Sequence, residues 1–214
     1  MDESSLRSFP LRRRLIDRAT VRDLAAGDRL QEPLLGDPWA ILVLAGVVRL
    51  YLSTGTAEPT IVLGGHGALL GTHTSMGRGG ASQLGLQAVT PSRILQVDSA
   101  AVAGALNTSG RSAMAVLDDS RREIRDLVEL NATRWSASLG QRLAHLLLVI
   151  SQLERFEPLL GVTEEQLAIG IGSIRESVAR SLADLRREGW IATTRHGVIL
   201  LDTEALRRYA DIIP

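Results

Sequence analysis

The most constraining feature of the chain lies near its C-terminal end, where residues 162–191 read VTEEQLAIGIGSIRESVARSLADLRREGWI. Thr163 and Ser173 are each followed three residues later by Gln or Glu, the spacing of a capping box at the start of a helix. Gly170 and Gly172 interrupt the apolar periodicity between these two starts. The stretch therefore predicts two short helices joined by a tight turn.

The second predicted helix has two unlike faces. Its apolar residues are spaced four, four and three apart, which at about 100° per residue makes one narrow stripe for packing. This stripe consists of Ile174, Val178, Leu182 and Leu185. Ser173, Glu176 and Arg180 point the other way, and Arg175 lies on the flank of the first turn. A buried stripe opposite hydrogen-bonding groups at the N-terminal end is typical of the recognition helix of a helix-turn-helix, which enters the major groove.

The residue types on the polar face fit base recognition. Arginine can donate two hydrogen bonds to O6 and N7 of guanine, and glutamate can accept from N4 of cytosine. The alternative is that Glu176 only completes a capping box and the arginines are solvated. The segment that follows, IATTRHGVILLD, predicts a β-hairpin with its turn at residues 195–197, and this order is that of a winged helix.

The rest of the chain divides into a β-rich part and helices. The segments VRDLAAGDRL, WAILVLAGVVRLYL, TIVLGG and SRILQVD are strand candidates between residues 21 and 98, and their tight turns predict an antiparallel barrel or roll. Residues 112–138 have helical periodicity, and QRLAHLLLVISQL over residues 141–153 predicts a further helix. Asp202 is placed to cap a last helix, TEALRRYA.

The helical segment 112–138 has an apolar seam with one polar residue in it. A long helix of this kind often pairs with a second copy of itself, although packing on its own domain is the alternative. The residues expected at the dimer interface are Leu117, Ile124, Leu127, Val128 and Asn131.

The stretch SIRESVARSLADLRREGWI resembles the recognition helix of the cyclic-AMP receptor protein and fumarate–nitrate regulator (CRP/FNR) family, whose motif is R-E-[ST]-V-x-R. The resemblance implies an α+β fold with three parts. These are an N-terminal antiparallel β-roll of the cyclic-nucleotide-binding, cupin-like jelly-roll type over residues 1–108, a dimerisation helix over 109–138 and a winged helix-turn-helix over 139–214.

The same resemblance implies roles for individual residues and partners. Arg175, Glu176 and Arg180 correspond to the base-reading residues of the family, and Ser177 to a phosphate-contacting one; Ser173 is expected to join them. Such members favour palindromic DNA with TGTGA-like half-sites, act as homodimers and engage RNA polymerase.

Two departures from the family pattern qualify these expectations. Glu164 stands where the family often has a basic residue that contacts phosphate. In the sensor, Ala68 of GHGALLG stands where cyclic-nucleotide binders have glutamate, and Ser82 occupies the place of the phosphate-binding arginine, with Arg78 the nearest candidate. We therefore expect a regulator that does not depend on cyclic AMP.

Composition excludes several other classes of protein. The chain has no cysteine, which rules out disulfides, thiolate zinc sites and cysteine-bound iron–sulfur clusters. The 214-residue sequence has no apolar run of about 18 residues and no secretory signal at its start, so we expect a cytoplasmic protein without a membrane span. We expect no enzymatic activity, no metal site and no cofactor.

Three alternatives stay open from the sequence. A haem sensor of the same family would use His66, His73 or His145, although their spacing is not diagnostic. A ligand-binding or enzymatic β-barrel would need clustered histidines and carboxylates. A protein-interaction module without DNA binding would fit residues 140–214, which hold nine arginines against ten acidic residues.

Overall fold

The computed structural model describes residues 19–30, 39–53, 58, 60–71, 84–98, 137–154 and 158–210, together with single positions between 104 and 125. Six of those single positions are helical, and all six are exposed; they are 104, 110, 114, 118, 121 and 125. The predicted dimer-interface residues Leu117, Ile124, Leu127, Val128 and Asn131 lie outside the described residues, as do Arg78, Ser82 and His73. Within the described part of the chain, no helix is long and apolar enough to cross a membrane.

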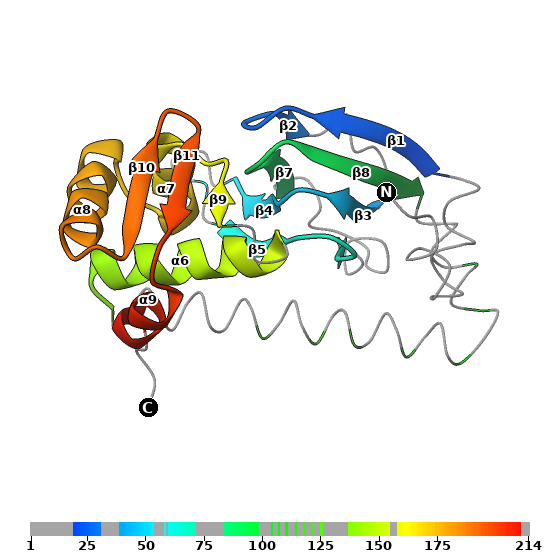
Figure 1. The fold of residues 1–214 in the computed structure, drawn as a ribbon. Coiled ribbons are helices and arrows are strands. Elements are labelled where there is room, and N and C mark those ends of the chain that lie inside the picture. The colour runs from blue at the N-terminus through cyan, green and yellow to red at the C-terminus, as the bar shows by residue number, and fades with distance from the viewer. Residues whose placement is uncertain are drawn as a thin grey trace.

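Two antiparallel four-stranded sheets form the N-terminal β-roll, as the sequence predicts (Figure 1). The first sheet has the order β1 (Ala19–Leu24), β8 (Ser92–Asp98), β3 (Trp39–Ala45) and β6 (Leu69–Leu70). The second has the order β2 (Arg29–Leu30), β7 (Leu84–Ala88), β4 (Val48–Leu52) and β5 (Thr60–Gly64). The four predicted strand segments all contain strands, whereas β6 and β7 are strands that the sequence analysis did not identify.

Alternation along β4 separates two buried environments. Val48 and Leu50 belong to an apolar cluster that takes residues from both sheets, including Ile41 and Ile94, and fills the inside of the roll. Arg49 and the residue two positions later therefore point to the opposite face of the sheet. That face is also closed to solvent, since Arg49 and Tyr51 are both completely buried.

All three nitrogens of the buried Arg49 guanidinium make hydrogen bonds. Its Nε donates to Oε1 of Gln87 at 2.8 Å, its Nη1 to Oγ1 of Thr60 at 3.2 Å, and its Nη2 lies 3.3 Å from Oε2 of Glu58. The guanidinium carbon also lies 4.7 Å from the ring centroid of Tyr51. Burial lowers the pKa of Arg49 to about 10, against the opposing effect of the Glu58 charge.

The C-terminal part, which we call the winged domain, comprises residues 139–210. Its helices are α6 (Leu139–Leu153), α7 (Glu164–Ile171), α8 (Arg175–Arg187) and α9 (Thr203–Ala210). Its three-stranded sheet has the order β10 (Ile191–Thr194), β11 (Gly197–Leu200) and β9 (Leu159–Leu160). The predicted hairpin is confirmed, and so is the cap of α9, where the amide of Ala205 donates to Oδ1 of Asp202 at 2.9 Å.

The winged domain and the β-roll share one apolar core. The cluster around α6, α7 and α8 includes Val47, Leu63 and Val89 from the roll. In Figure 1, β5 accordingly lies beside the C-terminal end of α6, while α8 and the β10–β11 hairpin lie at the far end of the molecule. This arrangement leaves α8 and the hairpin open to solvent on the side away from the roll.

Candidate nucleic-acid interface

The apolar stripe of α8 holds the helix in the winged domain. Val178, Leu182 and Leu185 are buried against α6 and α7, as their spacing predicts. Ile174, the fourth residue of the predicted stripe, is 63% exposed. The prediction was wrong at this position because Ile174 is the N-cap, with an extended backbone (φ −99°, ψ 152°), and therefore lies outside the helical wheel.

The two predicted capping boxes have different outcomes. At α7, Oγ1 of Thr163 accepts from the amide of Gln166 and Oε1 of Gln166 accepts from the amide of Thr163, so that box is confirmed. At α8, the helix begins one residue later than the predicted box requires, and its N-cap Ile174 has no side-chain acceptor. The proposed pairing of Ser173 with Glu176 is therefore wrong, and capping does not account for Glu176.

The polar residues at the start of α8 stand together on its open side. Arg175, Glu176 and Arg180 are exposed, and Ser173 and Ser177 are half-buried. Nη2 of Arg180 donates to Oγ of Ser177 at 3.0 Å, one helical turn earlier. A set of donors and one carboxylate thus projects from the N-terminal end of α8, opposite the face that packs.

Arg175 is held by a residue of the preceding helix. Its Nε donates to Oε2 of Glu164 at 3.0 Å, and both side chains remain open to water, at 69% and 40% exposure. The hydrogen bond and the charge of Glu164 raise the pKa of Arg175 above its ordinary value. Both residues stand out in the sequence, but their contact does not, because an eleven-residue separation across a turn has no periodic signal.

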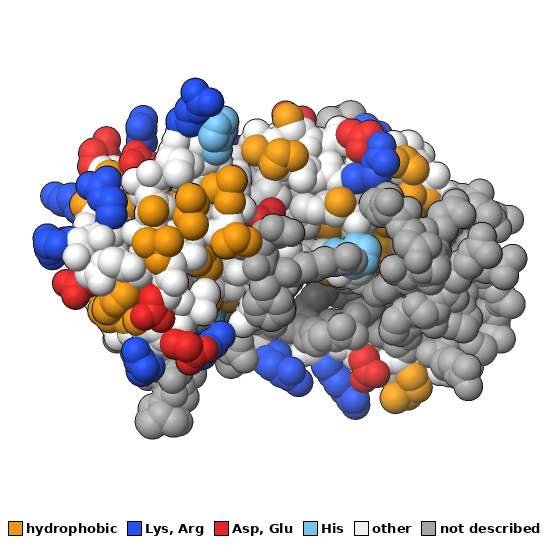
Figure 2. Space-filling model, in the orientation of Figure 1, with side chains coloured by type: hydrophobic (Ala, Val, Ile, Leu, Met, Phe, Trp, Pro, Cys, Tyr) orange, Lys and Arg blue, Asp and Glu red, His pale blue; other side chains and the backbone are white. Residues whose placement is uncertain are grey.

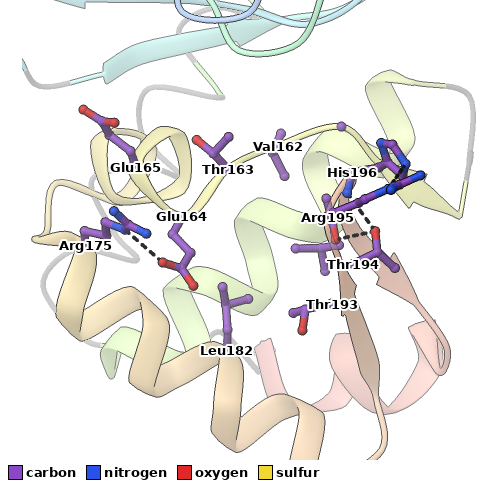
Figure 3. A pocket seen from close by; sticks show the side chains of 13 residues that line it. Val162, Thr163, Glu164, Glu165, Arg175, Leu182, Thr193, Thr194, Arg195 and His196 are labelled. Carbon is purple, nitrogen blue, oxygen red and sulfur yellow. Dashed lines mark hydrogen bonds and ion pairs between the residues drawn. The ribbon is translucent and has the colours of Figure 1, made fainter.

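An open cleft of about 450 Å³ separates the start of α7 and α8 from the β10–β11 hairpin. Figure 3 shows Glu164 and Arg175 on one side of this cleft, Leu182 at its centre, and Arg195 and His196 on the hairpin side. At the hairpin tip, Nε of Arg195 donates to Nε2 of His196 at 2.9 Å. The cleft therefore brings arginines from two separate elements to its rim.

Positive charge is local on the winged domain. The segment 140–214 has one more acidic residue than it has arginines, so it presents no basic field as a whole. Figure 2 nevertheless shows arginine side chains gathered at the end of the molecule that carries α8 and the hairpin, with acidic side chains between them. An anionic polymer would thus be bound at selected points rather than by general attraction.

Within the described ranges, no three histidine or acidic residues stand together as a metal site would require. His66 lies in the β5–β6 turn, where its Nδ1 is 2.6 Å from the carbonyl oxygen of Leu44. His145 lies in α6, inside the winged domain. These two haem-ligand candidates are thus in different parts of the molecule.

Comparison with known proteins agrees with the geometry of the winged domain. Residues 141–209 match the family described as a Crp-like helix-turn-helix domain. The transcriptional regulator LdrP of Thermus thermophilus is 40% identical over 94 residues, which are 42% of this chain and 48% of LdrP. SdrP of the same organism is 33% identical over 78 residues, 34% of this chain and 39% of SdrP. The chain thus covers half or less of the length of these curated relatives.

Solved structures extend the likeness over most of the chain. A CRP-family transcriptional regulator from Thermus thermophilus is 26% identical, with a TM-score of 0.71 over 88% of this chain and 96% of that one. FixK2 from Bradyrhizobium japonicum is 16% identical, with a TM-score of 0.74 over 92% of this chain and 99% of that one, and shows likeness of fold alone.

Proposed function

We propose that the chain is a transcriptional regulator of the CRP/FNR family, which acts in the cytoplasm as a homodimer that binds palindromic DNA; the Crp-like helix-turn-helix match and the similar regulators support this. In this proposal each protomer presents α8 to the major groove, and the two recognition helices lie about one helical turn of DNA, roughly 34–36 Å, apart. RNA polymerase is the partner that the bound dimer would recruit or block. The dimer would be held through Leu117, Ile124, Leu127, Val128 and Asn131.

The observation that carries this proposal is the asymmetry of α8. Its C-terminal stripe is buried, whereas Arg175, Glu176 and Arg180 are exposed together at its N-terminal end. The first residues of a recognition helix are those that reach base edges. Arginine suits guanine and glutamate suits cytosine, so the three side chains provide a readable pattern of donors and acceptors. Ser173 and Ser177, which are half-buried beside them, would contact phosphate.

We also propose that DNA binding does not require cyclic AMP. The support is chemical, because Ala68 and Ser82 carry no charge where the family's cyclic-nucleotide binders use glutamate and arginine. Leu127 and Val128 likewise lack the hydroxyl groups that would reach an adenine. The signal, if the β-roll receives one, would be of a different chemical class.

Selection of random duplex DNA by the purified protein, without added ligand and at a stated salt concentration, tests these proposals. We expect enrichment of a two-fold palindrome with G and C at the positions that Arg175 and Glu176 would read. Enrichment only after addition of cyclic AMP would contradict ligand independence. Failure to enrich any sequence with or without it, or in the presence of cell extract, would contradict sequence-specific binding.

A further inference from the structure

The ion pair between Arg175 and Glu164 joins the two helices of the helix-turn-helix at the surface that would face DNA. Glu164 is the first residue of α7, directly after the N-cap Thr163, where the helix dipole favours a carboxylate. Arg175 is the first residue of α8. The backbone of each residue is therefore positioned by the first turn of its own helix. Nε of Arg175 lies 3.0 Å from Oε2 of Glu164.

We propose that Glu164 determines DNA specificity by competing with DNA for the guanidinium of Arg175. This inference rests on the proposed function, since it assigns Glu164 a role in the same interface. In the free protein, Nε of Arg175 donates its hydrogen bond to the carboxylate of Glu164. Any DNA contact that uses Nε of Arg175 must then replace that ion pair.

The replacement is unequal for different sequences. A guanine at the right position offers O6 and N7, so Arg175 regains two hydrogen bonds when it leaves Glu164. Over another base, Arg175 finds no such pair of acceptors, and the carboxylate left behind stands close to the phosphate backbone. Glu164 should therefore weaken binding to unrelated sequences more than binding to the correct site.

The neighbouring Glu165 provides a matched control. It lies in the same first turn of α7 and carries the same charge, but its side chain points away from Arg175 (Figure 3). Removing either carboxylate reduces repulsion of phosphate by one charge. Glu165 acts on Arg175 through its charge alone, whereas Glu164 also holds it by a hydrogen bond, so the two substitutions separate the direct contact from the net charge.

The experiment measures dissociation constants for the selected palindrome and for a scrambled duplex of equal length, at one salt concentration. The variants are Glu164→Gln, Glu164→Asp, Glu165→Gln, Arg175→Ala and the double variant Glu164→Gln with Arg175→Ala. For Glu164→Gln we expect tighter binding to the scrambled duplex, with the specificity ratio lowered roughly two- to fivefold, the range of an exposed ion pair. Glu164→Asp keeps the charge but withdraws the carboxylate, and it should lower the ratio in the same way.

The controls define what would overturn the inference. Glu165→Gln should tighten binding to both duplexes equally, and Glu164→Gln should leave the ratio unchanged once Arg175 is absent. If Glu164→Gln leaves the specificity ratio unchanged, the competition proposal is overturned. An equal fall of the specificity ratio in Glu165→Gln would overturn it as well. A ratio that falls because the palindrome binds more weakly would make Glu164 a positioning residue instead. If selection enriches no sequence, the proposed function fails, and this inference fails with it.

Discussion

Gly65 of the β-roll and Leu153 of α6 approach each other so closely that there is no room for a side chain between them. A Cβ atom on Gly65 would stand 2.6 Å from Cβ of Leu153 and 2.9 Å from its carbonyl oxygen. Gly65 directly follows β5, and Leu153 is the last residue of α6. This contact therefore lies where the roll joins the winged domain, beside the apolar core that the two share.

Substitution of Gly65 by alanine should destabilise the joint between the two domains. Because one of the opposing atoms belongs to the backbone of Leu153, the clash cannot be relieved by a rotamer change alone. We expect a loss of about 1–3 kcal/mol in the free energy of unfolding, as for other overpacked sites, measured by urea denaturation. Gly161→Ala is the control, since no described atom lies within 4 Å of a Cβ at that position. Equal stability of the Gly65 variant and the parent would show that the contact yields easily.

The buried Arg49 and the exposed Arg29 share the carboxylate of Glu58, and they should differ in their contributions to stability. Arg49 is 1% exposed, whereas the side chain of Arg29 is 38% exposed. Arg49→Ala leaves a cavity and buried acceptors without donors, so we expect a loss of about 2–4 kcal/mol in the free energy of unfolding. Arg29→Ala removes an exposed ion pair and should cost less than about 1 kcal/mol. Similar losses for the two variants in urea denaturation would contradict this account.

The sequence predicted those elements whose signals are local. Strands β3 and β4 follow each other in one long apolar run of the sequence, and α7 begins with a complete capping box. Strand β7 reads LGLQA and has no such signal. Gly85 is needed there because a Cβ would stand 2.3 Å from Cζ of Tyr51, a contact made 34 positions away along the chain. This requirement comes from tertiary packing, so the residues next to Gly85 in the sequence do not indicate it.

At the candidate site, the sequence identified the helix and its polar face but misplaced the start of the helix. Ser173 and Glu176 have the spacing of a capping box, yet the backbone of Ile174 is extended and takes the N-cap position itself. The Glu164–Arg175 contact depends on how α7 and α8 cross, which periodicity within either helix does not contain. Residue types at the interface were thus predictable, whereas their partners were not.

Ile174 offers a test of the unusual start of α8. An isoleucine at the N-cap can accept no hydrogen bond, and it exposes 63% of its surface. Ile174→Ser would supply the missing acceptor, so we expect a gain of about 1 kcal/mol in the free energy of unfolding. Ile174→Ala removes the same apolar surface without adding a hydroxyl and should bring no such gain. If alanine stabilised the protein as much as serine did, the effect would come from the lost apolar surface and not from capping.

Arg180 and Arg187 lie on the same helix, carry the same charge, and should affect DNA binding differently. Arg180 is in the second turn of α8, where Nη2 donates to Oγ of Ser177. Arg187 is the last residue of the helix and pairs with Asp184 at 2.9 Å. If Arg180 reads a base, Arg180→Ala should cost about 1–3 kcal/mol on the selected palindrome and relax the preference at one base pair of each half-site. Arg187→Ala should change affinity for all sequences alike and leave every preference intact. Competition binding against single-substituted duplexes measures both variants, and an unchanged preference in Arg180→Ala would mean that a different face of α8 meets the DNA.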